Sequence, residues 1–208
     1  MPNHFRHITL LLAAIILGSL PLAAQKSDAV ATVRKAADKI LSAPSVTVSL
    51  TLSNGSEKQS ATLVMMRDAF TITAPSYRSW FDGRTQWTLF DETGEVNMTT
   101  PTASEIAESN PFTILSTLSS HYSLSPAPAP AGCSKVSLRP LKSSAPFSSA
   151  TITVNNSTLL PVSLTAVTSD GQTISVTVSK VTFGQKLPIS TFRFNQRDFP
   201  GVDIIDLR

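Results

Sequence analysis

Apolar residues between Val30 and Leu41 recur at intervals of three and four, with charged residues between them. That spacing is typical of a helix with one buried face. Ser27 can cap the first turn, and Pro44 follows the last one. We therefore expect a helix from Ser27 to about Leu41.

After residue 45 the apolar period shortens from about 3.6 to 2. Residues 46–53 alternate between Val or Leu and Thr or Ser, which predicts a strand with one buried face. Asn54-Gly55, Asp82-Gly83 and Asp170-Gly171 are typical of tight turns between strands. The same reasoning predicts further strands at 59–67, 70–73, 77–81, 85–90, 95–99, 122–124, 134–138, 150–154, 161–168, 173–180 and 191–194. About ten to twelve short strands indicate a mainly β domain with one antiparallel sheet, curled or closed.

Two short helices interrupt this series of strands. Thr102 and Glu105 have the spacing of a capping box, which predicts a helix that ends by Asn110. Asn110 and Pro111 can then cap and begin a second helix, to about Ser119. Inserted in the middle of a sheet, the pair can serve as its cover.

Several predicted strands are apolar on both faces, as at 63–66, Trp80-Phe81 and Leu89-Phe90. A half-exposed antiparallel strand should alternate instead. We therefore expect both faces to be covered, one by the N-terminal helix and the other by something inside the curl. Paired methionines at 65 and 66 suit a pocket that accepts variable shapes, although ordinary core packing explains them equally well.

The first 24 residues are typical of an export signal. Arg6 precedes an apolar run at 8–17, which is too short to span a bilayer, and small residues end at Ala24. We expect cleavage near Ala24 and one mature domain over 25–208, a size sufficient for its own core.

Composition argues against several classes of function. The net charge of +3 comes from 17 basic and 14 acidic residues that are scattered, so nucleic-acid binding is not indicated. Cys133 stands alone and His121 is the only histidine after residue 24, which leaves no set of metal ligands. No nucleophile elbow or phosphate-binding loop is present. We therefore expect no catalytic residue, no cofactor and no metal, and give little weight to a serine hydrolase.

Four stretches resemble the LolA family of lipoprotein carriers, in that family's order and spacing. They read LVMMRDAF (63–70), FDGRTQW (81–87), NPFTIL (110–115) and FRFNQRDFPGVDIIDLR (192–208). The likeness as a whole extends over nearly all of the mature chain. The resemblance implies an incomplete, half-open barrel of about eleven strands. An N-terminal helix and short lid helices would cover a hydrophobic cavity, and an arginine at the position of Arg67 would bond to the lid. On the residues alone, a solvated Arg67 at a hairpin end is the favoured interpretation.

The resemblance also implies a function and a set of site residues. The chain would be a monomeric periplasmic carrier that takes acylated lipoproteins from an inner-membrane release complex to an outer-membrane acceptor. Two alternatives stay open: a related module that binds free lipid or senses lipoproteins, and a structural β-domain with a filled interior. The residues expected to line the lipid cavity are Leu63, Met65, Phe70, Ile72, Trp80, Trp87, Leu89, Phe112 and Leu115, with Arg67 as the lid latch.

Overall fold

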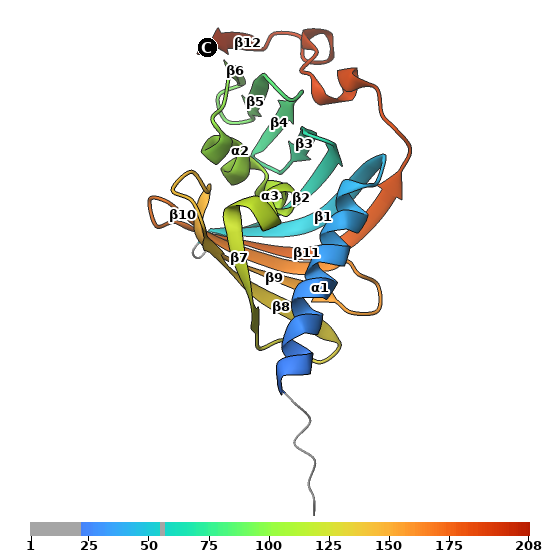
Figure 1. Ribbon diagram of the computed structural model, residues 1–208. Coiled ribbons are helices and arrows are strands. Elements are labelled where there is room, and N and C mark those ends of the chain that lie inside the picture. Colours follow the sequence, from blue (N-terminus) through green and yellow to red (C-terminus); the bar gives the residue numbers. More distant parts are fainter. Residues whose placement is uncertain (1–21, 55–56) are drawn as a thin grey trace, which may run out of the picture.

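Twelve strands form one sheet, and most neighbours in the sheet are also neighbours in the chain. The computed structural model describes residues 22–54 and 57–208 (Figure 1). Across the sheet the order is β12-β6-β5-β4-β3-β2-β1-β11-β10-β9-β8-β7. The bounds are β1 (Ser45–Asn54), β2 (Glu57–Met66), β3 (Ala69–Thr73), β4 (Tyr77–Phe81), β5 (Gln86–Phe90), β6 (Glu95–Thr99), β7 (Tyr122–Ala127), β8 (Cys133–Pro140), β9 (Phe147–Asn155), β10 (Pro161–Thr168), β11 (Thr173–Gly184) and β12 (Asp203–Asp206). The sheet curls but does not close, which confirms the predicted half-open barrel.

The end of the chain differs from the expectation. The strand predicted at 191–194 is instead a 3-10 helix, η2 (Ile189–Phe192). Its turn closes through a bond from Thr191 N–H to Pro188 O at 3.0 Å, next to a proline whose φ is restricted. The last strand, β12, pairs with β6 in parallel, whereas the other strand pairs are antiparallel. The local sequence pattern does not predict β12, because its four residues are all exposed and its partner strand lies about a hundred positions earlier in the chain.

The helices follow the predicted order, with one shifted start. They are α1 (Leu22–Leu41), α2 (Ala103–Ser109), η1 (Pro111–Thr113) and α3 (Ile114–His121), and a further turn, η3 (Gln196–Asp198), comes near the end. The first helix begins at Leu22 rather than Ser27, because 22–26 are mostly good helix formers. The predicted cleavage near Ala24 therefore falls in the first turn of α1. Residues 1–21 of the predicted export signal lie outside the described residues.

The capping interactions of the two short helices are those expected. Thr102 Oγ1 accepts a bond from Glu105 N–H at 3.3 Å, and Glu105 Oε2 accepts one from Thr102 N–H at 2.7 Å. Asn110 Oδ1 accepts a bond from Phe112 N–H at 3.1 Å and so begins η1. These bonds satisfy backbone groups that a helix start leaves unpaired, so the position of the pair is determined locally.

Both faces of part of the sheet are buried, but by other elements than expected. The N-terminal helix α1 lies inside the curl, against β7, β8 and β9 (Figure 1). Its Val33, Ala36, Ala37 and Ile40 belong to the same buried cluster as residues of the sheet and α3. The outer face at β3 and β4 is contacted instead by the C-terminal segment, residues 185–208, which passes outside the curl and ends as β12, paired with β6.

Candidate functional site

The inward-facing side chains form continuous rows across the sheet. Opposite residues of an antiparallel pair project to the same face, so Leu63, Ile72 and Ser79 share one row. Met65, Phe70 and Phe81 form the next row, which continues to Gln86 of β5. The rings of Phe70 and Phe81 lie 5.3 Å apart. The pairing thus determines which residues of β2–β5 face the helices.

Much of the concave surface is filled by the protein itself. Side chains of α1 and α3 pack against β7–β11, where Val136, Ile152 and Leu164 are each 2% exposed or less. The filling ends at the C-terminal end of α1. There, between α1 and strands β2 and β4, space remains.

An apolar cavity of about 590 Å³ occupies that space. It lies between the end of α1, strands β1, β2 and β4, and the helices α2, η1 and α3, within the size range of about 300–1,000 Å³ usual for small-ligand sites. Its apolar wall consists of Ile40, Leu41, Ala43, Val46, Met65, Phe81, Ile106 and Phe112, and its polar rim of Arg67, Asp68, Asn110, Thr113 and Ser116. We call this space the apolar cavity.

The nine residues expected to line a lipid cavity fall into three groups. Met65 and Phe112 line the apolar cavity. The second group belongs to the buried cluster around it, each member at most 7% exposed, and consists of Leu63, Phe70, Ile72 and Leu115. By the strand pairing, the third group, Trp80, Trp87 and Leu89, lies on the outer face. Phe81 and Ile106 line the cavity but were not among the predicted residues.

The predicted latch, Arg67, lies at the mouth of the apolar cavity. It is exposed and adopts a positive φ of 54°, which lets the chain turn tightly from β2 into β3. Lid residues Asn110, Thr113 and Ser116 border the same cavity. Among the described residues, no hydrogen bond or ion pair joins Arg67 to α2 or α3.

The two lid helices are instead attached to different parts of the fold. Gln86 Nε2 donates to Ser109 Oγ of α2 at 3.1 Å, and also to Ser79 Oγ at 3.0 Å. In contrast, Arg34 of α1 donates a bond to Ser119 of α3. The sequence pattern missed Gln86 because a glutamine next to Trp87 does not stand out. The one indication in the sequence is that Gln86 occupies an inward-facing position of β5, where inward and outward residues alternate.

On the far side of α2 most residues of the concave face are polar, although Phe90 and Pro101 also border it. A cleft of about 400 Å³, which we call the polar cleft, lies between the inner face of β4–β6 and α2. Its wall includes Tyr77, Gln86 and Thr88 of the sheet and Glu105 and Glu108 of the helix. Burial raises the pKa of the Tyr77 phenol, so this group stays neutral and able to donate. Hydrogen bonds from Thr102 lower the pKa of Glu105, which keeps that carboxylate charged.

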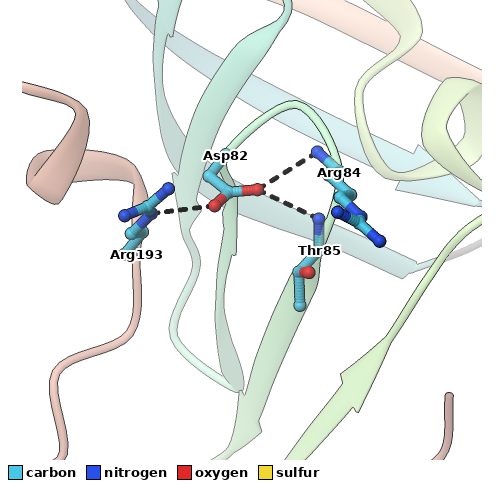
Figure 2. Close-up of polar contacts among 4 residues, drawn as sticks. All are labelled: Asp82, Arg84, Thr85 and Arg193. Carbon is cyan, nitrogen blue, oxygen red and sulfur yellow. Dashed lines mark hydrogen bonds and ion pairs between the residues drawn. The ribbon is translucent and has the colours of Figure 1, made fainter.

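An ion pair attaches the C-terminal segment to the hairpin between β4 and β5 (Figure 2). Arg193 Nε donates to Asp82 Oδ2 at 2.8 Å, and Asp82 Oδ1 accepts from the N–H groups of Arg84 and Thr85 at 3.1 and 3.0 Å. Burial alone would raise the pKa of Asp82, but these bonds and the guanidinium charge outweigh it and lower the pKa.

Aromatic rings complete this attachment on the outer face. Trp80 makes edge contacts with Phe194 and Phe199, each at 5.5 Å between ring centroids. Arg78 lies over the Phe199 ring at 5.4 Å. Trp80 therefore packs against the C-terminal segment on the outer face and does not border the apolar cavity.

In the part of the chain that the structure describes, none of the helices combines the length and hydropathy that a membrane span requires.

Comparison with solved structures places this fold among known ones. An uncharacterized conserved protein from Thermus thermophilus superposes with a TM-score of 0.54 at 10% identity, over 85% of this chain and 98% of that one. A LolA superfamily protein from Nitrosomonas europaea gives 0.42 at 11% identity, over 79% and 97% of the two chains. A putative outer membrane lipoprotein-sorting protein domain from Vibrio parahaemolyticus gives 0.43 at 11% identity, over 82% and 97%.

No curated protein matches the sequence. The family described as outer membrane lipoprotein carrier protein LolA does match, over residues 21–135, which is more than half of the chain. That stretch contains α1, the strands that border the apolar cavity and both lid helices. The chain therefore belongs to the LolA family of outer membrane lipoprotein carrier proteins.

Proposed function

We propose that the protein is a periplasmic, non-enzymatic carrier that shields acyl chains of lipoproteins in the apolar cavity. It would receive them from a release complex at the inner membrane and deliver them to an acceptor at the outer membrane. The observation that carries this proposal is the cavity itself, which has an apolar wall and is covered by two short helices. Membership of the carrier family supports it.

The energy of acyl burial explains why such a cavity needs a lid. Each buried methylene is worth about 0.8 kcal/mol, so a chain of about sixteen carbons loses on the order of 12 kcal/mol when it is left in water. A carrier must hide that surface during transfer and then release it. A cover that closes through a few polar bonds can do both, because such bonds contribute only about 0.5–1.5 kcal/mol each.

Arg67 is the proposed latch between the cavity mouth and the two short helices that cover it. Its exposed guanidinium carries N–H donors, and Asn110 and Thr113 on the covering helices border the same cavity. When the cavity is empty and the helices close further over it, these donors would bond to acceptors on those residues. Entry of an acyl chain would break those bonds, and their recovery would help release. The test is Arg67→Leu in an assay that measures lipoprotein loading and hand-off separately. If neither step changes, Arg67 has no latch role.

Cavity occupancy can be tested by adding bulk at its rim. Ser116 borders the cavity, whereas Ser120, one turn later on α3, does not; both are exposed and both donate to a backbone carbonyl. We expect Ser116→Trp to weaken binding of a fluorescent palmitate analogue, while Ser120→Trp leaves it unchanged. Equal affinities in the two variants would place the binding site elsewhere. A wild-type protein that binds no acyl probe would contradict the carrier function.

The chemical identity of the ligand distinguishes carriage of lipoproteins from carriage of free lipid. Mass spectrometry of material that co-purifies with the protein should find acylated cysteine attached to peptide. Free phospholipid alone would indicate a lipid-binding module on the same half-barrel.

A further inference from the structure

The concave face has two chemistries, one on each side of α2. Ile106 and Asn110 face the apolar cavity, while Glu105, Glu108 and Ser109 border the polar cleft. An α-helix with its side chains is about 10–12 Å across. The two spaces are therefore close enough for one extended molecule to occupy both, with different parts of it meeting different surroundings.

The polar cleft contains a buried group with unused hydrogen-bonding capacity. Gln86 is only 7% exposed, and its Nε2 donates to hydroxyls of Ser79 and Ser109. Its Oε1 has no partner among the described residues, although Gln86 borders the cleft. Among the described residues, the one buried side-chain atom without a partner is Nδ1 of His121, so the Gln86 oxygen is open to the cleft. It can therefore accept a bond from a backbone N–H of a ligand.

The negative charge of the cleft wall restricts the class of ligand further. Glu105 and Glu108 are the charged residues of the cleft wall, and no lysine or arginine borders it among the residues described. Phosphate groups are bound by basic side chains or by helix N-termini, and carboxylates close by repel them. The cleft therefore suits amides, hydroxyls and cations rather than an anionic lipid headgroup.

We propose that the polar cleft binds the peptide that follows the acylated residue of a lipoprotein, while the acyl chain lies in the apolar cavity across α2. This inference rests on the proposed carrier function and gives it a second half-site. An extended chain advances about 3.3–3.6 Å per residue, so about three or four residues span the width of α2. The carrier would thus contact the first few residues of its cargo and favour neutral or basic ones.

Three synthetic probes separate the two half-sites. N-methyl palmitamide carries an acyl chain alone, and two palmitoylated tetrapeptide amides differ only in a lysine or a glutamate at the fourth position. We expect the lysine peptide to bind several-fold more tightly than the glutamate peptide, because charge pairs between solvent-exposed groups are weak. N-methyl palmitamide should bind to the apolar cavity whatever the cleft contributes.

Glu108→Lys tests the charge of the cleft. Glu108 is exposed, so the variant is expected to fold, and the preference for the lysine peptide should disappear or reverse. Glu92→Lys is the matched control, because Glu92 is an exposed glutamate in the turn between β5 and β6, outside the cleft. An equal effect of both variants, or of neither, would overturn the inference.

Gln86→Leu tests the amide. This change removes both the bond to α2 and the free acceptor, whereas Ser109→Ala removes only the bond. We compare the affinity for each peptide with the affinity for N-methyl palmitamide in the same variant. This ratio should fall several-fold more in Gln86→Leu than in Ser109→Ala. Equal losses would mean that Gln86 acts only on the lid. If N-methyl palmitamide itself does not bind, the carrier function fails; if it binds and the peptide adds nothing, only the peptide site fails.

Discussion

The inward-facing residues of the curled sheet differ between its two ends, where different helices pack against it. Over β8–β10 the inward residues, such as Val136, Ile152 and Leu164, are apolar and almost completely buried beneath α1. Over β4 and β5 the inward residues include Ser79, Gln86 and Thr88, and α2 is tied to them through the Gln86–Ser109 hydrogen bond.

This difference in polarity suggests that one end of the sheet stabilises the fold and the other allows α2 to move. Apolar burial is large and non-directional, so the end filled by α1 can hold the fold together. One hydrogen bond is worth little net, and Ala107 is the buried residue of α2, so we expect α2 to leave β5 at small cost. We therefore expect α2 to open without loosening the end that α1 fills.

The largest effect is expected in the filled end. Ile152→Ala removes a side chain that is 1% exposed in the centre of this cluster, and should lower the free energy of unfolding by about 2–5 kcal/mol. Urea denaturation measures it. Leu141→Ala, at a position 60% exposed, serves as the control and should change this value by no more than about 0.5 kcal/mol. An Ile152→Ala effect as small as that of the control would refute the view that this end anchors the fold.

A smaller effect is expected at the lid. Thr102→Ala removes the side chain that caps α2, which costs about 0.5–2 kcal/mol of helix stability. Amide hydrogen exchange of α2 should accelerate accordingly. In Ile152→Ala, by comparison, exchange should accelerate in β9 and change little in α2, because α2 opens on its own. If α2 and β9 accelerate together in that variant, the two ends form one cooperative unit and the comparison breaks down.

The smallest effect is expected for the C-terminal segment, and it depends on pH. Because the pKa of Asp82 is lowered in the folded protein, its ionised form stabilises the attachment above its ordinary pKa near 3.9. That contribution is lost as the pH falls through the lower folded value. Both tryptophans lie on the outer face beneath this segment or beside it, so their fluorescence should report a loosening below about pH 4.

Asp82→Asn provides the control for that titration. The amide oxygen can still accept from Arg84 and Thr85, but it offers Arg193 no charge. The variant should show the loosened fluorescence already at neutral pH and a weaker acid transition. An unchanged transition would assign it to another carboxyl, such as Asp206, whose bonds to Arg208 lower its pKa to about 2.

The sequence predicted the fold better than the site. Strands β1–β11, the capping box of α2 and the Asn110 cap were predictable from the sequence because alternation, turns and caps act over a few residues. For the site, the sequence analysis named Trp80 as a cavity residue and left out Phe81. Both are apolar, but they lie on opposite faces of β4, and Phe81 is the one that borders the cavity. An uninterrupted apolar run carries no information about which side is inward.

Local order along the chain was therefore determined by the sequence alone: the helix, the hairpins, and two capped turns placed between the halves of a sheet. Only the tertiary structure decided that α1 lies inside the curl, that residues 203–206 pair with β6, and that Gln86 meets Ser109. Each of these contacts joins residues distant in the chain, and short-range periodicity cannot specify them. They form because the apolar faces and unpaired polar groups left by local folding must find partners elsewhere.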